Sequence, residues 1–292
     1  MTRPFVLPLI HCTDLALVGG KALGLARLAT AGFPVPPGIC VTTEAYDQSL
    51  RLSNFSANET WRNAYALSGQ ERASALADCQ ARIRKVDSSG LSMQWLTELQ
   101  ALANPPNQRW AVRSSATNED AGRTSFAGLY RTHLGLSLSQ IDAAIKDLWA
   151  SLWQDAVMRY TVERIGHQTV PAMAVVIQPM LEAQTSGVAY SIHPVTGRSF
   201  HVAVNAVPGL AAPLVDGQVT PDQYVVEMGE NQQPARVRRR IIASKPQRLI
   251  ATEEGLRQEF IPESARTQSS LSDEQLFELA RTAKKVEQTF GY

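Results

Sequence analysis

Strand-like and helix-like segments mix along the whole chain, and this mixture is the feature that most limits its fold. Apolar, β-rich runs stand at residues 109–113 (RWAVR), 171–181 (PAMAVVIQPML) and 200–207 (FHVAVNAV). Patterns of helical period fill residues 44–103 and return in the amphipathic segment 271–292. The chain is therefore neither all-helical nor all-β, and its class is α/β or α+β.

Several segments carry more detailed expectations. Residues 17–43 predict a glycine turn, a helix that stops at Gly32, a proline-rich corner and a strand. Residues 139–166 predict a single helix that stops at Gly166. Within residues 44–103 the expected core positions are Tyr46, Leu50, Trp61, Tyr65, Leu76, Ile83, Leu91, Trp95 and Leu99.

Composition bounds the class of protein. The chain has 292 residues, enough for two domains or two lobes around a cleft. Its formal net charge of +1 provides no bulk attraction to nucleic acid or membrane. Cys12, Cys40 and Cys79 form no CxxC pair, so we expect neither structural zinc nor a disulfide framework. With neither a signal-peptide pattern nor an apolar run of about 18 residues, we expect a cytoplasmic protein.

A polar motif, AVRSSATNED (111–120), follows the first β-rich run. Its polar members are Arg113, Ser114, Ser115, Thr117, Glu119 and Asp120. A guanidinium and neighbouring hydroxyls suit the oxygens of a phosphate, which predicts a phosphate site. The alternative is a strand that simply ends in a polar turn.

A second motif is GGK, residues 19–21, directly before the predicted helix. Backbone amides of a glycine turn and of a helix N-terminus attract anions, and Lys21 adds a mobile positive charge. The spacing is not that of a full P-loop, so a turn followed by a surface lysine remains the alternative.

Two further segments could contact a nucleotide. In SFAG (125–128), Ser125 begins a small-residue loop in which Gly128 would let backbone approach a polyphosphate; an ordinary hairpin is the alternative. In VVIQPM (175–180), Gln178 and Met180 end an apolar strand and could border an adenine ring. A buried strand leaving the core explains the latter pattern equally well.

The remaining motifs favour structural roles. RVRRR (236–240) is a basic cluster without aromatic neighbours, and its alternation favours a strand with a solvated arginine face over a nucleic-acid site. None of the five histidines stands at metal-ligand spacing from another.

Taken together, four blocks resemble the nucleotide-binding domain of the pyruvate phosphate dikinase and phosphoenolpyruvate synthase group, which includes rifampin phosphotransferases. They are LVGGKALGLARLATAGFPVPPGICVTTEAY, AVRSSATNEDAGRTSFAGLYRTHLG, VVIQPMLEAQTSGVAY and GQVTPDQYVV, in the order of that group. The blocks spread across nearly the whole chain, and the arginine block is highly specific.

The resemblance implies an α+β fold of the ATP-grasp type, with one lobe at 1–177 and a second at 178–292. It implies that Lys21 and Arg113 contact the phosphates of ATP, that Ser125 to Gly128 cover them, and that Gln178 to Met180 link the lobes beside adenine. The implied reaction, with magnesium, sends the β-phosphoryl group of ATP to a histidine on a separate domain and releases AMP and phosphate. The phosphohistidine then phosphorylates pyruvate or, in one branch, a drug hydroxyl.

The sequence also departs from that group. Gly209 to Ala212 (GLAA) stands where relatives have GLGE, and Gln184 replaces a common acid. The chain ends at Tyr292, ahead of a segment in which relatives carry metal-binding carboxylates. We therefore assign no metal ligand, and expect turnover to require a phosphohistidine domain and an acceptor domain. The alternative to an enzyme is a non-catalytic nucleotide-binding module.

Overall fold

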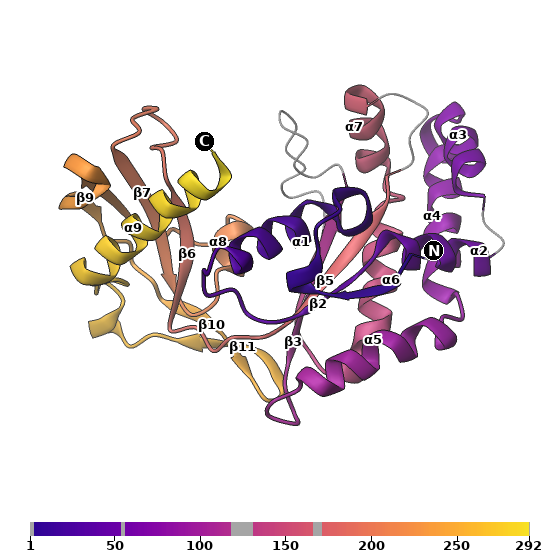
Figure 1. Ribbon diagram of the computed structural model, residues 1–292, viewed down its shortest axis with the longest axis horizontal. Helices are drawn as coiled ribbons and strands as arrows, with labels where there is room; N and C mark the ends of the chain where they lie inside the picture. The colour runs from indigo at the N-terminus through magenta and orange to yellow at the C-terminus, as the bar shows by residue number, and fades with distance from the viewer. Residues whose placement is uncertain (1–2, 54–55, 118–130, 166–170, 292) are drawn as a thin grey trace. The chain divides into compact units, whose positions relative to one another are not determined.

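The computed structural model describes residues 3–53, 56–117, 131–165 and 171–291. The chain divides into two compact units, Met1–Met180 and Leu181–Tyr292, hereafter unit 1 and unit 2. Each unit combines helices with an antiparallel sheet, so the α+β class is confirmed (Figure 1). We expected a boundary after residue 177; strand β5 (Met173–Pro179) continues two residues beyond it.

A five-stranded antiparallel sheet forms the centre of unit 1. Its order is β1 (Val6–Pro8), β2 (Ile39–Val41), β5, β3 (Trp110–Ala116) and β4 (Thr132–Leu136). Strand β5 lies in the middle, paired with β2 on one side and β3 on the other. All its residues before Pro179 are buried, as an apolar strand with both faces covered requires.

Helices cover both faces of this sheet. Helix α1 (Leu15–Thr30) packs with Ala174 and Val176 on one face. The alternate residues of β5 point to the other face, into a core built largely by helices. Those helices are α2 (Thr43–Leu52), α3 (Ala57–Ala66), α4 (Gly69–Lys85), α5 (Ser89–Leu102), α6 (Ile141–Ser151) and α7 (Asp155–Ile165). Residues 44–103 are thus mostly helical, as predicted.

The core of unit 1 contains every tryptophan of the chain. All five are fully buried: Trp61, Trp95, Trp110, Trp149 and Trp153. Two pairs meet edge to face, which aromatic rings prefer over flat stacking. The nine core positions expected in residues 44–103 are confirmed as buried, except that Tyr65 is half-buried at the edge of this core.

The single helix predicted over residues 139–166 is wrong. Helix α6 ends at Ser151, and α7 begins at Asp155. Between them Trp153 turns inward, and its indole N–H donates to the hydroxyl of Tyr46 at 3.1 Å. Burial of this large ring outweighs the regular helical period, which continues in the sequence across the break.

Unit 2 is built on a four-stranded antiparallel sheet. Its order is β6 (Thr185–Tyr190), β7 (His201–Pro208), β8 (Asp222–Met228) and β9 (Pro234–Ile241). Helix α9 (Asp273–Phe290) lies along this sheet and ends at the left-handed Gly291 (Figure 1). The short helix α8 (Ala212–Val215) and a hairpin of β10 (Gln247–Thr252) and β11 (Gly255–Phe260), which we did not predict, complete the unit.

Short 3-10 turns connect some of these elements, at Leu9–His11, Leu138–Gln140, Glu230–Gln232 and Glu263–Ala265. Among the residues that the structure describes, no helix has both the length and the apolar character needed to cross a membrane. The basic cluster forms the exposed strand β9, as its alternation predicted. Arg236 and Arg238 both pair with Glu227, and Arg240 pairs with Asp273.

A buried carboxylate joins three segments of unit 2. Oδ1 of Asp222 accepts hydrogen bonds from Nζ of Lys245 (2.6 Å) and from the backbone N–H of Ala243 (2.9 Å). Oδ2 accepts from the hydroxyl (2.6 Å) and N–H (2.9 Å) of Ser270 and from the hydroxyl of Tyr224 (3.2 Å). Burial alone would raise the pKa of Asp222, but these donors outweigh it and hold the pKa below its ordinary value.

Candidate functional site

Helix α1 is broken at the GGK motif. We expected the helix to follow the glycines, but it begins earlier, at Leu15, where the carboxylate of Asp14 accepts from the N–H of Ala16. One turn later Gly19 leaves the helical conformation, with φ 71° and ψ 173°. Lys21 therefore lies at the start of a second helical segment, which ends as predicted before Gly32.

A serine of strand β3, Ser115, lies against this break. The hydroxyl of Ser115 donates to the carbonyl of Val18 at 2.7 Å and accepts from the N–H of Ala22 at 3.0 Å. A Cβ at Gly19 would come within 1.9 Å of the carbonyl oxygen of Ser115, so only glycine fits here. The backbone at Gly19 and strand β3 are thus sterically complementary.

The first turn of α1 is held from a second side. The hydroxyl of Thr43 donates to the carbonyl of Ala16 at 2.9 Å, and the thiol of Cys40 lies 3.7 Å from the carbonyl oxygen of Val18. Burial raises the pKa of the Cys40 thiol well above its ordinary value, and its hydrogen bond with Cys12 raises it further. The thiol therefore stays protonated and serves as a weak donor.

Arg113 and the turn of α1 that bears Lys21 lie on the same side of the sheet in unit 1. Side chains alternate along a strand, so Arg113 points to the side of Ser115, two residues away. Ser115 contacts α1 on that side, immediately before and after the Gly19–Lys21 turn. Both cationic side chains are half-buried. The turn that bears Lys21 and the side chain of Arg113 thus lie on the same side of the sheet.

The hydroxyls of the arginine motif do not join them. Ser114 lies on the opposite face of β3 from Arg113, by the same alternation. Ser115 is used by α1, and the hydroxyl of Thr117 lies 3.4 Å from the carbonyl of Ala172. Our expectation that these hydroxyls gather around a phosphate is therefore wrong for Ser115. Ser125, Gly128, Glu119 and Asp120 lie outside the described residues.

Gln178 and Met180 sit at the end of strand β5. Nε2 of Gln178 donates to the carbonyl of Pro36 at 2.9 Å and fixes the strand end to the proline-rich corner. The N–H of Met180 donates to the carbonyl of Arg109 at 2.8 Å. Both groups are thus committed within unit 1, which leaves the half-buried side chain of Met180 as the part that could pack against a ring.

The two departures from the resembling group are neighbours in unit 2. The N–H of Gly209 donates to the carbonyl of Gln184 at 2.8 Å, and the N–H of Leu210 donates to Leu249 at 2.7 Å. Gly209 has φ 74°, and a Cβ there would come within 2.2 Å of the Leu249 carbonyl. The glycine is therefore required by the backbone, whereas both acidic positions are occupied by uncharged residues.

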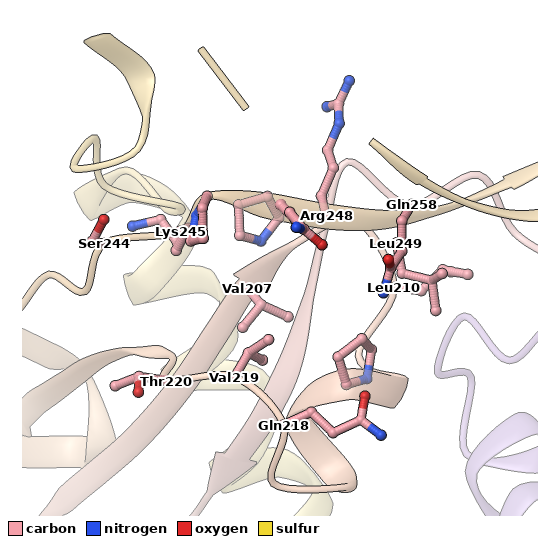
Figure 2. Close-up of a pocket in the computed structure, with 14 residues that line it drawn as sticks. Val207, Leu210, Gln218, Val219, Thr220, Ser244, Lys245, Arg248, Leu249 and Gln258 are labelled. Carbon is pink, nitrogen blue, oxygen red and sulfur yellow. The ribbon is translucent and has the colours of Figure 1, made fainter. Parts of the chain in front are cut away.

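Unit 2 also contains a pocket of 410 Å³ beside this segment. Val207, Leu210 and Val219 contribute apolar walls, and Gln218 and Thr220 contribute polar groups (Figure 2). Its two cations are already paired: Lys245 with Asp222, and Arg248 with Glu259. Figure 2 shows the Arg248 side chain extending away from the labelled valines. The pocket is thus suited to an uncharged group more than to phosphate.

Residues 15–292 match the model of the pyruvate phosphate dikinase AMP/ATP-binding domain. The chain belongs to this family. The resemblance carried by the four sequence blocks is thereby confirmed, and the pair Lys21 and Arg113 lies in an AMP/ATP-binding domain.

The relatives that the chain matches are much longer than the chain itself. Phosphoenolpyruvate synthases from Pyrococcus furiosus and Aeropyrum pernix are 28% and 34% identical over 96% and 74% of the chain. A rifampicin phosphotransferase from Bacillus cereus is 32% identical over 97% of it. The chain spans 39%, 27% and 32%, respectively, of the lengths of these relatives.

Proposed function

We propose that this domain binds ATP as part of a dikinase-type phosphotransferase, and that units 1 and 2 are the two lobes of an ATP-grasp fold. Lys21 and Arg113 bind the phosphates, and Met180 packs beside the adenine. Ser125 and Gly128 belong to the proposal as the loop over the phosphates. The observation that supports it is the contact of Ser115 with α1, which holds the Gly19–Lys21 turn against strand β3 on the face to which Arg113 points.

The proposed reaction moves the β-phosphoryl group of ATP to a histidine of a phosphohistidine domain, toward pyruvate as the acceptor. Such transfer depends on positioning and on stabilisation of charge at the phosphoryl oxygens. Arg113 offers a planar fork that can hold two oxygens at once, and Lys21 offers a compact charge on a flexible stem. The phosphohistidine and acceptor domains are the partners that the proposal requires.

Magnesium is expected to accompany ATP in this reaction. In the part of the chain that the structure describes, no three histidine, cysteine, aspartate or glutamate side chains come together as a metal site. The described residues therefore do not fit a complete magnesium site, and no step is assigned to the ion here.

Two alternatives rest on specific observations. The rifampicin phosphotransferase of Bacillus cereus matches as much of the chain as the synthases do, so a drug hydroxyl is the second candidate acceptor. The uncharged Gln184 and Gly209–Ala212 segments, adjacent in unit 2, favour a non-catalytic nucleotide-binding module. Formation of AMP with a supplied phosphohistidine domain separates catalysis from binding alone.

The direct test is calorimetric titration of the whole chain with ATP. We expect Lys21→Ala to weaken binding roughly tenfold to a hundredfold, since a charge-assisted contact contributes about 1.5–3 kcal/mol. We expect Arg113→Lys to reduce AMP formation more than ATP affinity, because lysine keeps the charge but loses the fork. Unchanged affinity in a folded Lys21→Ala variant would remove Lys21 from the site.

A further inference from the structure

The hydroxyl of Ser115 replaces a helical hydrogen bond at the Gly19 break. In an unbroken helix the N–H of Ala22 would bond to the carbonyl of Val18, four residues earlier. Here both groups turn to Ser115 Oγ instead, which accepts from Ala22 at 3.0 Å and donates to Val18 at 2.7 Å. One buried atom thus bridges the gap that the non-helical glycine opens.

This bridge leaves Ser115 no proton for a ligand. A serine hydroxyl has a single hydrogen, and that hydrogen is directed to the carbonyl of Val18. Phosphate oxygens accept hydrogen bonds and need a donor. Ser115 is also fully buried. Its contribution to a phosphate site must therefore be indirect.

The bridged segment is the one that carries Lys21. Only Gly19, Gly20 and Lys21 lie between the two groups that Ser115 binds. On the strand side, Arg113 is two residues from Ser115 and on the same face. Ser115 consequently links the backbone that bears the lysine to the backbone that bears the arginine.

We propose that Ser115 is a positioning residue: its hydroxyl fixes the Gly19–Lys21 turn against strand β3, so that Lys21 and Arg113 address the same phosphate chain. This inference rests on the proposed function, because it assumes that Lys21 contacts ATP. A residue that acts through Lys21 should lose its effect once the Lys21 ammonium is removed. That property distinguishes positioning from a general contribution to packing.

The test is a double-mutant cycle on the whole chain, with ATP affinity measured by calorimetry. We expect Ser115→Ala to weaken ATP binding about threefold to tenfold, the range of one hydrogen bond. In a Lys21→Ala background the same substitution should change affinity by less than about twofold. Equal weakening by Ser115→Ala in both backgrounds, or none in either, would overturn the inference.

Ser151→Ala is the matched control. Ser151 is also fully buried, and its hydroxyl donates to the carbonyl of Leu148 within unit 1, at 2.6 Å. This variant loses one buried serine hydrogen bond without touching the Gly19 break, and it should keep the affinity of the wild type. A loss equal to that of Ser115→Ala would show that destabilisation alone weakens binding, and would overturn positioning.

Ser115→Cys covers the case in which the alanine variant fails to fold. A thiol is similar in shape to the hydroxyl, but it is a weaker donor and its hydrogen bonds are longer. We therefore expect Ser115→Cys to reduce the affinity for ATP, and we expect this reduction to disappear in a Lys21→Ala background. The two hypotheses fail differently. If wild type and Lys21→Ala bind ATP equally, the proposed function fails; if they differ and both Ser115 variants bind like wild type, only the positioning role fails.

Discussion

Each unit joins a strand to distant backbone through one buried polar side chain, and the two joints differ in charge. In unit 1 the neutral Ser115 makes two hydrogen bonds at the α1 break. In unit 2 the carboxylate of Asp222 accepts five, one of them from the buried ammonium of Lys245. Loss of the serine removes one partner from the N–H of Ala22 and leaves the carbonyl of Val18 with the weak Cys40 donor, whereas loss of the aspartate leaves a buried charge. The charged joint should govern stability, and the neutral one should govern local placement.

The largest effect is expected from Asp222→Ala. Breaking a buried ion pair by removing one partner costs about 3–5 kcal/mol, because the remaining charge is left uncompensated. Lys245 is nearly as buried as Asp222, with 4% of its side chain exposed. We expect amide hydrogen exchange in β7 and β8 to speed up accordingly, while the tryptophan fluorescence of unit 1 reports little change.

Glu259→Ala is the control for this prediction. Glu259 pairs with Arg248 on the exposed β10–β11 hairpin, and surface ion pairs contribute about 0–1 kcal/mol. An equal loss of stability in the two variants would contradict the distinction between a buried charged joint and an exposed pair.

The second prediction concerns the steric fit at the neutral joint. Gly19→Ala should destabilise unit 1 by about 2–4 kcal/mol, combining overpacking against Ser115 with a positive φ. Gly32→Ala is the matched control, since Gly32 also has a positive φ, 83°, but a Cβ there meets nothing within 4 Å. Urea unfolding followed by tryptophan fluorescence measures both, and equal losses would mean that the contact with Ser115 has no steric role.

The third prediction uses acid to weaken only the charged joint. Because the folded-state pKa of Asp222 is lowered, the unfolded chain binds more protons between the lowered value and the ordinary one of about 3.9. The stability from Asp222 is therefore fully present above that ordinary value and is lost as pH falls toward the lowered one. Urea unfolding followed by circular dichroism should show a steeper acid loss for wild type than for Asp222→Asn; parallel slopes would exclude Asp222 as the source.

The smallest effect is expected from Thr43→Val, which tests a second neutral joint on α1. Its hydroxyl supports the carbonyl of Ala16, before the break, and not the turn that carries Lys21. We expect a loss of about 0.5–1.5 kcal/mol in the unfolding of unit 1, with less change in ATP affinity than Ser115→Ala causes. A larger change in affinity than that of Ser115→Ala would place the sensitive point in the first turn of α1.

Local patterns predicted most elements of this fold but not the contacts between them. The stops at Gly32 and Gly291 follow from glycine at the end of a helical period, and both are found in left-handed conformation. The break between α6 and α7 depends on where the ring of Trp153 is buried, which no period in the sequence reveals.

The candidate site likewise contains residues that the sequence could predict and a contact that only the fold shows. Lys21 and Arg113 could be proposed from the sequence, because their residue types suit phosphate and their motifs resemble those of the family that the chain matches. The role of Ser115 was not, because its two partners lie more than ninety positions away in the sequence. A serine beside an arginine suggested a ligand contact, and only the fold shows that its proton is already used.

The order of strands in unit 1 has a consequence for synthesis of the chain. Strand β3, which holds the Lys21 turn, reaches β2 only through β5, which ends at Pro179. At translation rates of about 5–20 residues per second, the ribosome makes Lys21 roughly 8–30 seconds before it completes β5. Until then β5 cannot pair with β2 and β3, and contacts between segments so far apart in the sequence form late in folding. Ribosome-bound chains of increasing length should therefore gain ATP affinity abruptly once β5 has emerged, and not in proportion to length.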